Sequence, residues 1–94
     1  MTDKERSCEE FSRLLEIIDK LRQNCPWDMQ QTNESLRKLT IEETYELADA
    51  VLSGDDDGIR KELGDLMLHI VFYAKIRKEK NLGTKTEVLK GINE

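Results

Sequence analysis

The sequence has 94 residues, of which 37% are charged and only 5% are aromatic, a composition typical of a helical protein with long polar helix faces. Its formal net charge of −5 argues against binding to nucleic acid polymers or anionic membranes, because both require a net positive surface. No apolar run approaches the roughly 20 residues of a membrane span, and two cysteines are too few for a disulfide framework or a zinc site. We therefore expect one cytoplasmic domain over residues 1–94.

The first predicted helix begins at one of two capping boxes, at residues 2–5 or 7–10. Its apolar residues follow the helical period and are predicted to face the core: Phe11, Leu14, Leu15, Ile18 and Leu21. Pro26 ends this helix, because proline disfavours helical geometry in the residue before it. From there to Thr32 we predict a polar loop that carries the only tryptophan, Trp27.

A helical turn is predicted over residues 33–38, and a long helix from Ile41 to Gly54 either follows it or continues it. The predicted apolar side of this helix comprises Ile41, Tyr45, Leu47, Ala48, Val51 and Leu52.

The aspartates at 55–57 cap the next predicted helix, which runs to about Lys80. Its predicted core stripe comprises Leu63, Leu66, Met67, Ile70, Val71 and Ala74. Residues 81–83 end it, and a last short helix follows residue 84. The predicted fold class is all-α, an antiparallel helical bundle. Because so short a chain buries little apolar surface alone, we expect it to be completed by oligomerisation, as a homodimer or homotetramer.

Two acidic pairs carry the chemistry of the sequence. Glu43 and Glu46 share one face of a predicted helix, and Glu62 and Asp65 share one face of the next. If the two helices are antiparallel, the four carboxylates point at one spot, where their mutual repulsion favours a bound cation. Carboxylate oxygens favour Mg²⁺, with Mn²⁺ as a substitute, and carboxylate-bound Mg²⁺ commonly accompanies a phosphate-bearing substrate. The alternative is that these acids are ordinary solvated surface. Gly64, which lies between Glu62 and Asp65, either allows close helix packing or leaves room for substrate.

The sequence resembles the MazG family of nucleoside triphosphate pyrophosphohydrolases, part of the all-α NTP pyrophosphatase group. The family pattern EExxE followed by ExxD stands here as Glu42-Glu43-x-x-Glu46 and Glu62-x-x-Asp65. A second landmark of the family, CPWDxxQTxxSL, is matched by residues 25–36, and the resemblance extends over residues 11–91.

The resemblance implies Mg²⁺-dependent hydrolysis of a nucleoside triphosphate between its α and β phosphates, giving monophosphate and pyrophosphate. The implied role is the removal of surplus or non-standard nucleotides. By position in the motif, Glu42 is implied to orient or deprotonate the attacking water. The implied metal ligands are Glu43, Glu46, Glu62 and Asp65.

Four further residues are candidates for substrate binding: Trp27, Lys61, His69 and Tyr73. Lys61 would contact the triphosphate, and Trp27 would either stack on the base or anchor its loop in the core. His69 stands where the family commonly has glutamine. It either supports the acidic site or is a hydrogen-bonded histidine in a subunit interface.

The family's domain usually continues into a basic segment similar to RRHPHVF, whereas this sequence ends at Glu94. We therefore expect a trimmed or shortened member that lacks some phosphate-binding residues. This expectation keeps an alternative function open, a non-catalytic helical interaction module that binds metal or nucleotide. A purely structural dimerisation domain is the third interpretation.

Overall fold

Five helices make up the chain, and the computed structural model describes all of it, residues 1–94. They are α1 (Asp3–Asn24), α2 (Pro26–Met29), α3 (Asn33–Ser53), α4 (Asp56–Glu79) and α5 (Lys85–Asn93). The all-α prediction is therefore confirmed. No helix combines the length and the apolar character that crossing a bilayer requires.

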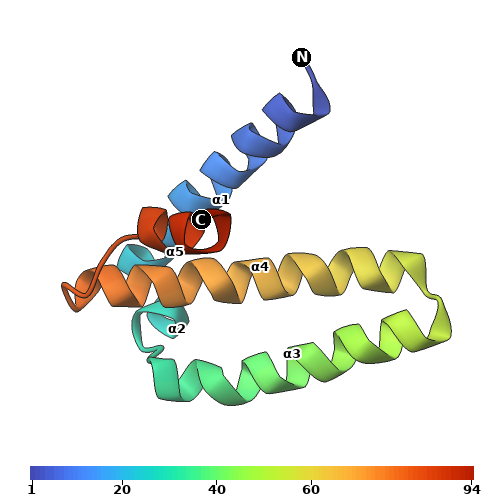
Figure 1. Cartoon of the computed structure of the whole chain (residues 1–94). Coiled ribbons are helices and arrows are strands. Elements are labelled where there is room, and N and C mark those ends of the chain that lie inside the picture. The colour runs from blue at the N-terminus through green and yellow to red at the C-terminus, as the bar shows by residue number, and fades with distance from the viewer.

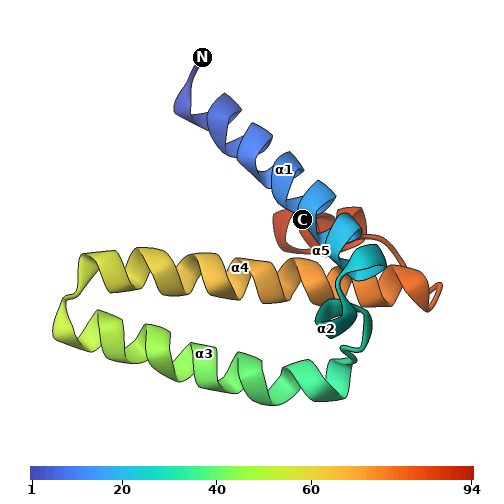
Figure 2. The ribbon, with the colours of Figure 1, turned by 180° about the vertical axis from the view of Figure 1, so that it is seen from behind.

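Two long helices, α3 and α4, run antiparallel side by side as a hairpin (Figures 1 and 2). Gly54 makes the turn between them with a φ of 69°, a left-handed conformation that glycine adopts without steric cost. Asp55 then caps α4, its side chain accepting a hydrogen bond of 3.0 Å from the backbone N–H of Gly58. This turn brings the acidic segments of the two helices alongside each other.

The core lies at one end of this hairpin, where α1 crosses the C-terminal half of α4 (Figure 1). Five buried side chains form it: Ile18, Leu36, Val71, Phe72 and Ile76. Each contributes about 1.5–3 kcal/mol to folding relative to an exposed position. The first half of α1 projects away from the other helices (Figure 2), and α5 packs on α4.

Arg22 of α1 ties three elements together near this core. Its guanidinium donates two hydrogen bonds to the Glu79 carboxylate at the end of α4, at 2.9 and 2.8 Å. It also donates to the backbone carbonyls of Asp28 and Gln31, at 2.7 and 2.8 Å, and lies 5.6 Å from the ring centroid of Phe72. The connection between α1 and α3 is thereby fixed against α4.

The predictions for the first helix are confirmed, with one correction after it. Thr2 caps α1 by accepting from the backbone N–H of Glu5, and the predicted stripe around Ile18 faces the core. The segment predicted as a loop, however, contains the short helix α2. Pro26 stands at its first position, where the missing N–H is not needed.

Of the two alternatives for the next segment, the structure has the continuous one, because α3 runs unbroken from Asn33 through Ile41 to Ser53. Thr32 and Ser35 form its capping box, each side chain bonding the other's backbone N–H at 3.1 and 2.9 Å. Thr40 lies inside the helix, and its hydroxyl donates to the carbonyl oxygen of Leu36 at 3.0 Å.

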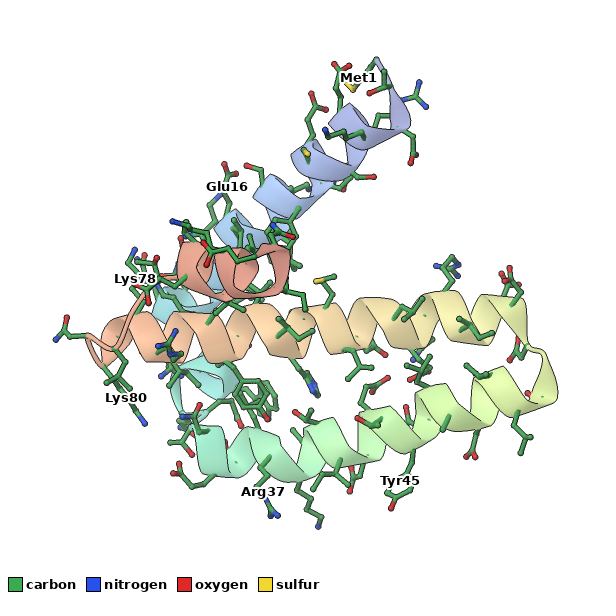
Figure 3. All side chains as sticks on the ribbon, viewed as in Figure 1. Met1, Glu16, Arg37, Tyr45, Lys78 and Lys80 are labelled. Atoms are coloured by element: carbon green, nitrogen blue, oxygen red, sulfur yellow. The ribbon has the colours of Figure 1, made fainter.

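The predicted apolar side of α3 is largely exposed. Tyr45 and Leu52 are 69% and 89% exposed, and Tyr45 points away from α4 together with Arg37 (Figure 3). On α4, Val71 and Ala74 are buried as predicted, whereas the remaining members of the predicted stripe are partly or largely exposed: Leu63, Leu66, Met67 and Ile70. The chain therefore turns its acidic side, not its most apolar side, toward the inside of the hairpin. Gly64 is no close-packing point within the chain, since a Cβ there would meet no atom within 4 Å.

Candidate metal centre

Three carboxylates meet between the two helices of the hairpin. Glu43 comes from α3, and Glu62 and Asp65 come from α4, three residues apart and thus on one face. One oxygen from each lies within 4.8 Å of the other two. Glu62 is only 8% exposed and is the one buried charged residue of the chain.

Two oxygens in this cluster have no hydrogen-bond donor in the protein. They are Oε1 of Glu43 and Oε2 of Glu62, both buried. Ionised carboxylates only accept hydrogen bonds, so the pair needs either a shared proton or a cation. Burial, the neighbouring Glu62 carboxyl and the acidic charges around it raise the pKa of Glu43 to about 8, while the sharing of a proton with Glu43 lowers the pKa of Glu62. These unpartnered oxygens fit a hard divalent cation, because an ion of this kind takes oxygen ligands.

Two charged residues border the cluster. Glu46, the fourth predicted ligand, is exposed, and its pKa is raised chiefly by its hydrogen bond with Glu62 and by the charge of that residue. Lys61 places its Nζ 3.1 Å from Oδ2 of Asp65 and 3.3 Å from Oε1 of Glu62. These contacts raise the pKa of Lys61 to about 12. Of the four predicted ligands, Glu43, Glu62 and Asp65 thus form the cluster, and Glu46 lies at its edge.

The structure places two other predicted residues outside this cluster. Glu42 lies on the exposed surface of α3, next in sequence to Glu43. Trp27 lies on α2, is 55% exposed, and its backbone carbonyl accepts a hydrogen bond of 2.8 Å from Nε2 of Gln31. The indole of Trp27 is not an anchor in the core.

His69 and Tyr73 meet at a residue that the sequence interpretation missed as part of the site. The Thr40 hydroxyl lies 3.0 Å from Nδ1 of His69 and 2.6 Å from the Tyr73 hydroxyl. Because Thr40 uses its single proton on the carbonyl of Leu36, both partners must donate to it, which assigns the Nδ1–H tautomer to His69. The available signal in the sequence was the threonine three residues before Glu43.

An open groove of about 430 Å³ leads away from the cluster toward the turn of the hairpin. Its walls are formed by Glu46, Asp49, Ala50, Ser53, Asp55, Gly58 and Glu62. All charged residues in these walls are acidic. A triphosphate would therefore be repelled from the groove unless cations accompanied it.

Comparison with known proteins identifies the family of the chain. Residues 31–94 match the family described as "MazG nucleotide pyrophosphohydrolase domain". The chain belongs to the MazG family. The family implies a divalent metal, and the cluster of Glu43, Glu62 and Asp65 is able to bind one.

Several curated proteins are similar to this MazG-family chain. The "Nucleoside triphosphate pyrophosphohydrolase/pyrophosphatase MazG" of Thermotoga maritima is 43% identical over 86 residues, which cover 89% of the chain and 34% of that protein. The "Nucleoside triphosphate pyrophosphohydrolase" of Mycobacterium tuberculosis is 52% identical over 63 residues, 67% of the chain and 19% of that protein. The Escherichia coli K12 protein of the same name is 45% identical over 73 residues, 74% of the chain and 28% of that protein. The chain thus spans about a third or less of the length of these relatives.

Proposed function

We propose that this MazG-family chain is a nucleoside triphosphate pyrophosphohydrolase that uses Mg²⁺ and cleaves between the α and β phosphates. The observation that carries the proposal is the pair of buried carboxylate oxygens without donors, at the head of an acidic groove. The names of the relatives support the same reaction class. Removal of surplus or non-standard nucleotides in the cytoplasm is the role that we propose for it.

Glu43, Glu62 and Asp65 would hold the metal, with Glu46 at the edge of the groove as a further ligand. The ion, when bound, stabilises charge on the phosphate oxygens and lowers the pKa of water. The chain itself fixes the positions of the metal-binding groups. The helices α3 and α4 hold the carboxylates at a fixed separation, and the hairpin shields Glu62 from water. Since phosphoryl transfer depends mainly on positioning and electrostatics, no covalent nucleophile is needed.

Glu42 is proposed to take the proton of the attacking water. It lies next to Glu43 in α3 but outside the compact cluster, so it can serve as a base without acting as a ligand. Glu42→Gln should therefore abolish turnover while Mg²⁺ still stabilises the protein. Glu43→Gln should abolish both turnover and stabilisation.

The reaction is tested by incubating the chain with Mg²⁺ and a panel of NTPs and dNTPs and separating the products. Monophosphate and pyrophosphate are expected. Diphosphate and orthophosphate would contradict the proposed cleavage position. Stabilisation by Mg²⁺ and nucleotide without any product would instead identify a non-catalytic binding module.

We also propose that residues 1–94 form one domain that a second copy completes, as a homodimer or homotetramer. Only 8 of the 94 residues are buried, and large apolar side chains lie exposed along the hairpin, among them Leu52, Leu63 and Ile70. Exposed apolar surface on this scale commonly marks an interface. Sedimentation over a range of concentrations tests this, and a monomer throughout would contradict it.

A further inference from the structure

One cationic side chain is already bound to the carboxylates of the candidate metal centre. The ammonium of Lys61 lies 3.1 Å from Asp65 and 3.3 Å from Glu62, within ion-pair distance of both. Its neighbour Arg60 differs, because its guanidinium faces Asp57 at a distance of 3.9 Å and has no partner in the cluster. Lys61 is the one basic residue that forms ion pairs with these carboxylates.

This ammonium and a divalent cation would compete for the same two carboxylates. A metal ion held by Glu62 and Asp65 would approach their oxygens to about 2.0–2.6 Å, depending on the ion. The ammonium now lies close to the same two carboxylates, so the two cations would be only a few ångströms apart and would repel each other strongly. The ammonium contacts Oε1 of Glu62, whereas the oxygen without a partner is Oε2. A metal on Oε2 would share the carboxylate with Lys61, and the repulsion between the two cations would favour the departure of the ammonium.

The side chain of Lys61 is free to make this movement. It is 65% exposed, in contrast to the 11% of its partner Glu62, and its four-carbon stem allows the ammonium to swing without any change in the helix. Its partner Glu62 lines the groove, whose walls contain acidic residues but no basic residue that could compete with Lys61 for phosphate. Phosphate oxygens brought there with the metal would be its strongest available partners.

We propose that Lys61 is a resident counter-ion that exchanges places with the metal: its ammonium neutralises Glu62 and Asp65, yields them to the divalent cation, and then binds the substrate's phosphates. This inference rests on the function proposed above. It gives Lys61 opposite effects on the binding of two ligands. Lys61 opposes binding of the metal alone and favours binding of the metal–nucleotide complex.

The first test measures Mg²⁺ alone, by titration calorimetry on chelator-treated protein without nucleotide. Lys61→Met should bind Mg²⁺ about three- to tenfold more tightly than the unaltered chain, the factor expected from the loss of one or two exposed ion pairs. Arg60→Met is the matched control, because it removes the same charge one residue away. Arg60→Met should change the affinity for Mg²⁺ much less than Lys61→Met does.

The second test uses a nucleoside triphosphate with a methylene group in place of the α–β bridging oxygen, which cannot be cleaved there. At saturating Mg²⁺, Lys61→Met should bind this analogue about tenfold more weakly than the unaltered chain, whereas Arg60→Met should bind it normally.

The outcomes separate the inference from the function on which it rests. If the unaltered chain binds no Mg²⁺, the proposed function fails. If Mg²⁺ binds but Lys61→Met and Arg60→Met bind it equally, only the exchange is overturned. Tighter Mg²⁺ binding with an unchanged affinity for the analogue would overturn the transfer of Lys61 to phosphate.

Discussion

The two ends of the α3–α4 hairpin are held together by different forces. At the end covered by α1, Leu36, Phe72 and Ile76 are buried against one another. Toward the turn, the buried residues are Ala50 and Glu62, and the acidic cluster takes the place of an apolar core. One pair of helices thus combines a region stabilised by packing with a region that is electrostatically incomplete. Stability is concentrated at the first end, and ligand dependence is expected at the second.

The packed end should show the largest effect of a single substitution. Ile18→Ala removes a side chain that is 1% exposed and should lower the free energy of unfolding by about 2–5 kcal/mol, because it leaves a cavity in the core. Leu82→Ala removes a similar number of carbons from a residue that is 61% exposed and should cost less than about 0.5 kcal/mol. Urea unfolding measures the free energy of unfolding of each variant. Equal losses would show that the core around Ile18 contributes no more to stability than exposed surface does.

The acidic end should respond to metal instead. At a Mg²⁺ concentration about 100-fold above the dissociation constant, the unaltered chain should gain about 2.7 kcal/mol of stability. Glu62→Gln should lose this gain, and its metal-free form should be at least as stable as the unaltered one, since an amide can donate to Glu43. Thermal unfolding with Mg²⁺ or with chelator measures both. Glu16→Gln, an exposed acid on α1, is the control and should keep the full response.

The contacts that link α1 to the end of α4 should contribute slightly less to the free energy of unfolding than bound Mg²⁺ does. Arg22→Met breaks the paired hydrogen bonds to Glu79 and those to two backbone carbonyls, and should cost about 2 kcal/mol. Arg60→Met loses only an exposed contact of 3.9 Å and should be nearly neutral. Chemical denaturation distinguishes them, and a neutral Arg22→Met would show that packing alone fixes this link.

The smallest effect concerns pH. The folded chain holds a proton on Glu43 up to about pH 8, which the unfolded chain releases near the usual 4.5, so the free energy of unfolding should fall as pH rises through this window. Water partly screens the group, which limits the size of the decline. Carboxyls whose pKa is lowered, such as Glu79 beside Arg22, lose their contribution only below pH 4.5 and leave this window unaffected.

Unfolding of chelator-treated protein between pH 4.5 and 8 measures the trend, and Glu43→Gln should flatten it. A rise in stability across the window would show that no proton is retained. Mg²⁺ should bind more tightly as pH increases, because its binding displaces that proton.

Local chemistry explains what the sequence could predict. Thr2, Gly54 and Asp55 act on backbone groups within a few residues, and each ends or begins a helix as predicted. The meeting of Glu43 with Glu62 and Asp65 followed from helical spacing together with one short turn.

The remaining features depend on which side of each helix meets its neighbour. Both α3 and α4 carry apolar residues on more than one side, so the pattern did not reveal that Tyr45 would be exposed and Glu62 buried. The usual rule that charged residues face water does not hold for Glu62, which is buried at a site built from charged residues. Thr40 and Arg22 join segments 29 or more residues apart, and contacts of that kind have no signature in local sequence.

The hydroxyl of Thr40 has a mechanical consequence for the carboxylates one turn away. It holds His69 and Tyr73 of α4 against a single point on α3, so two hydrogen bonds set the axial register of the two helices there. A slip of one helical turn, about 5.4 Å, would break the contacts across the hairpin. The same slip would move Glu43 beyond the reach of an ion shared with Asp65. An uncharged residue outside the acidic motif thereby determines the span over which the charged ones can act together.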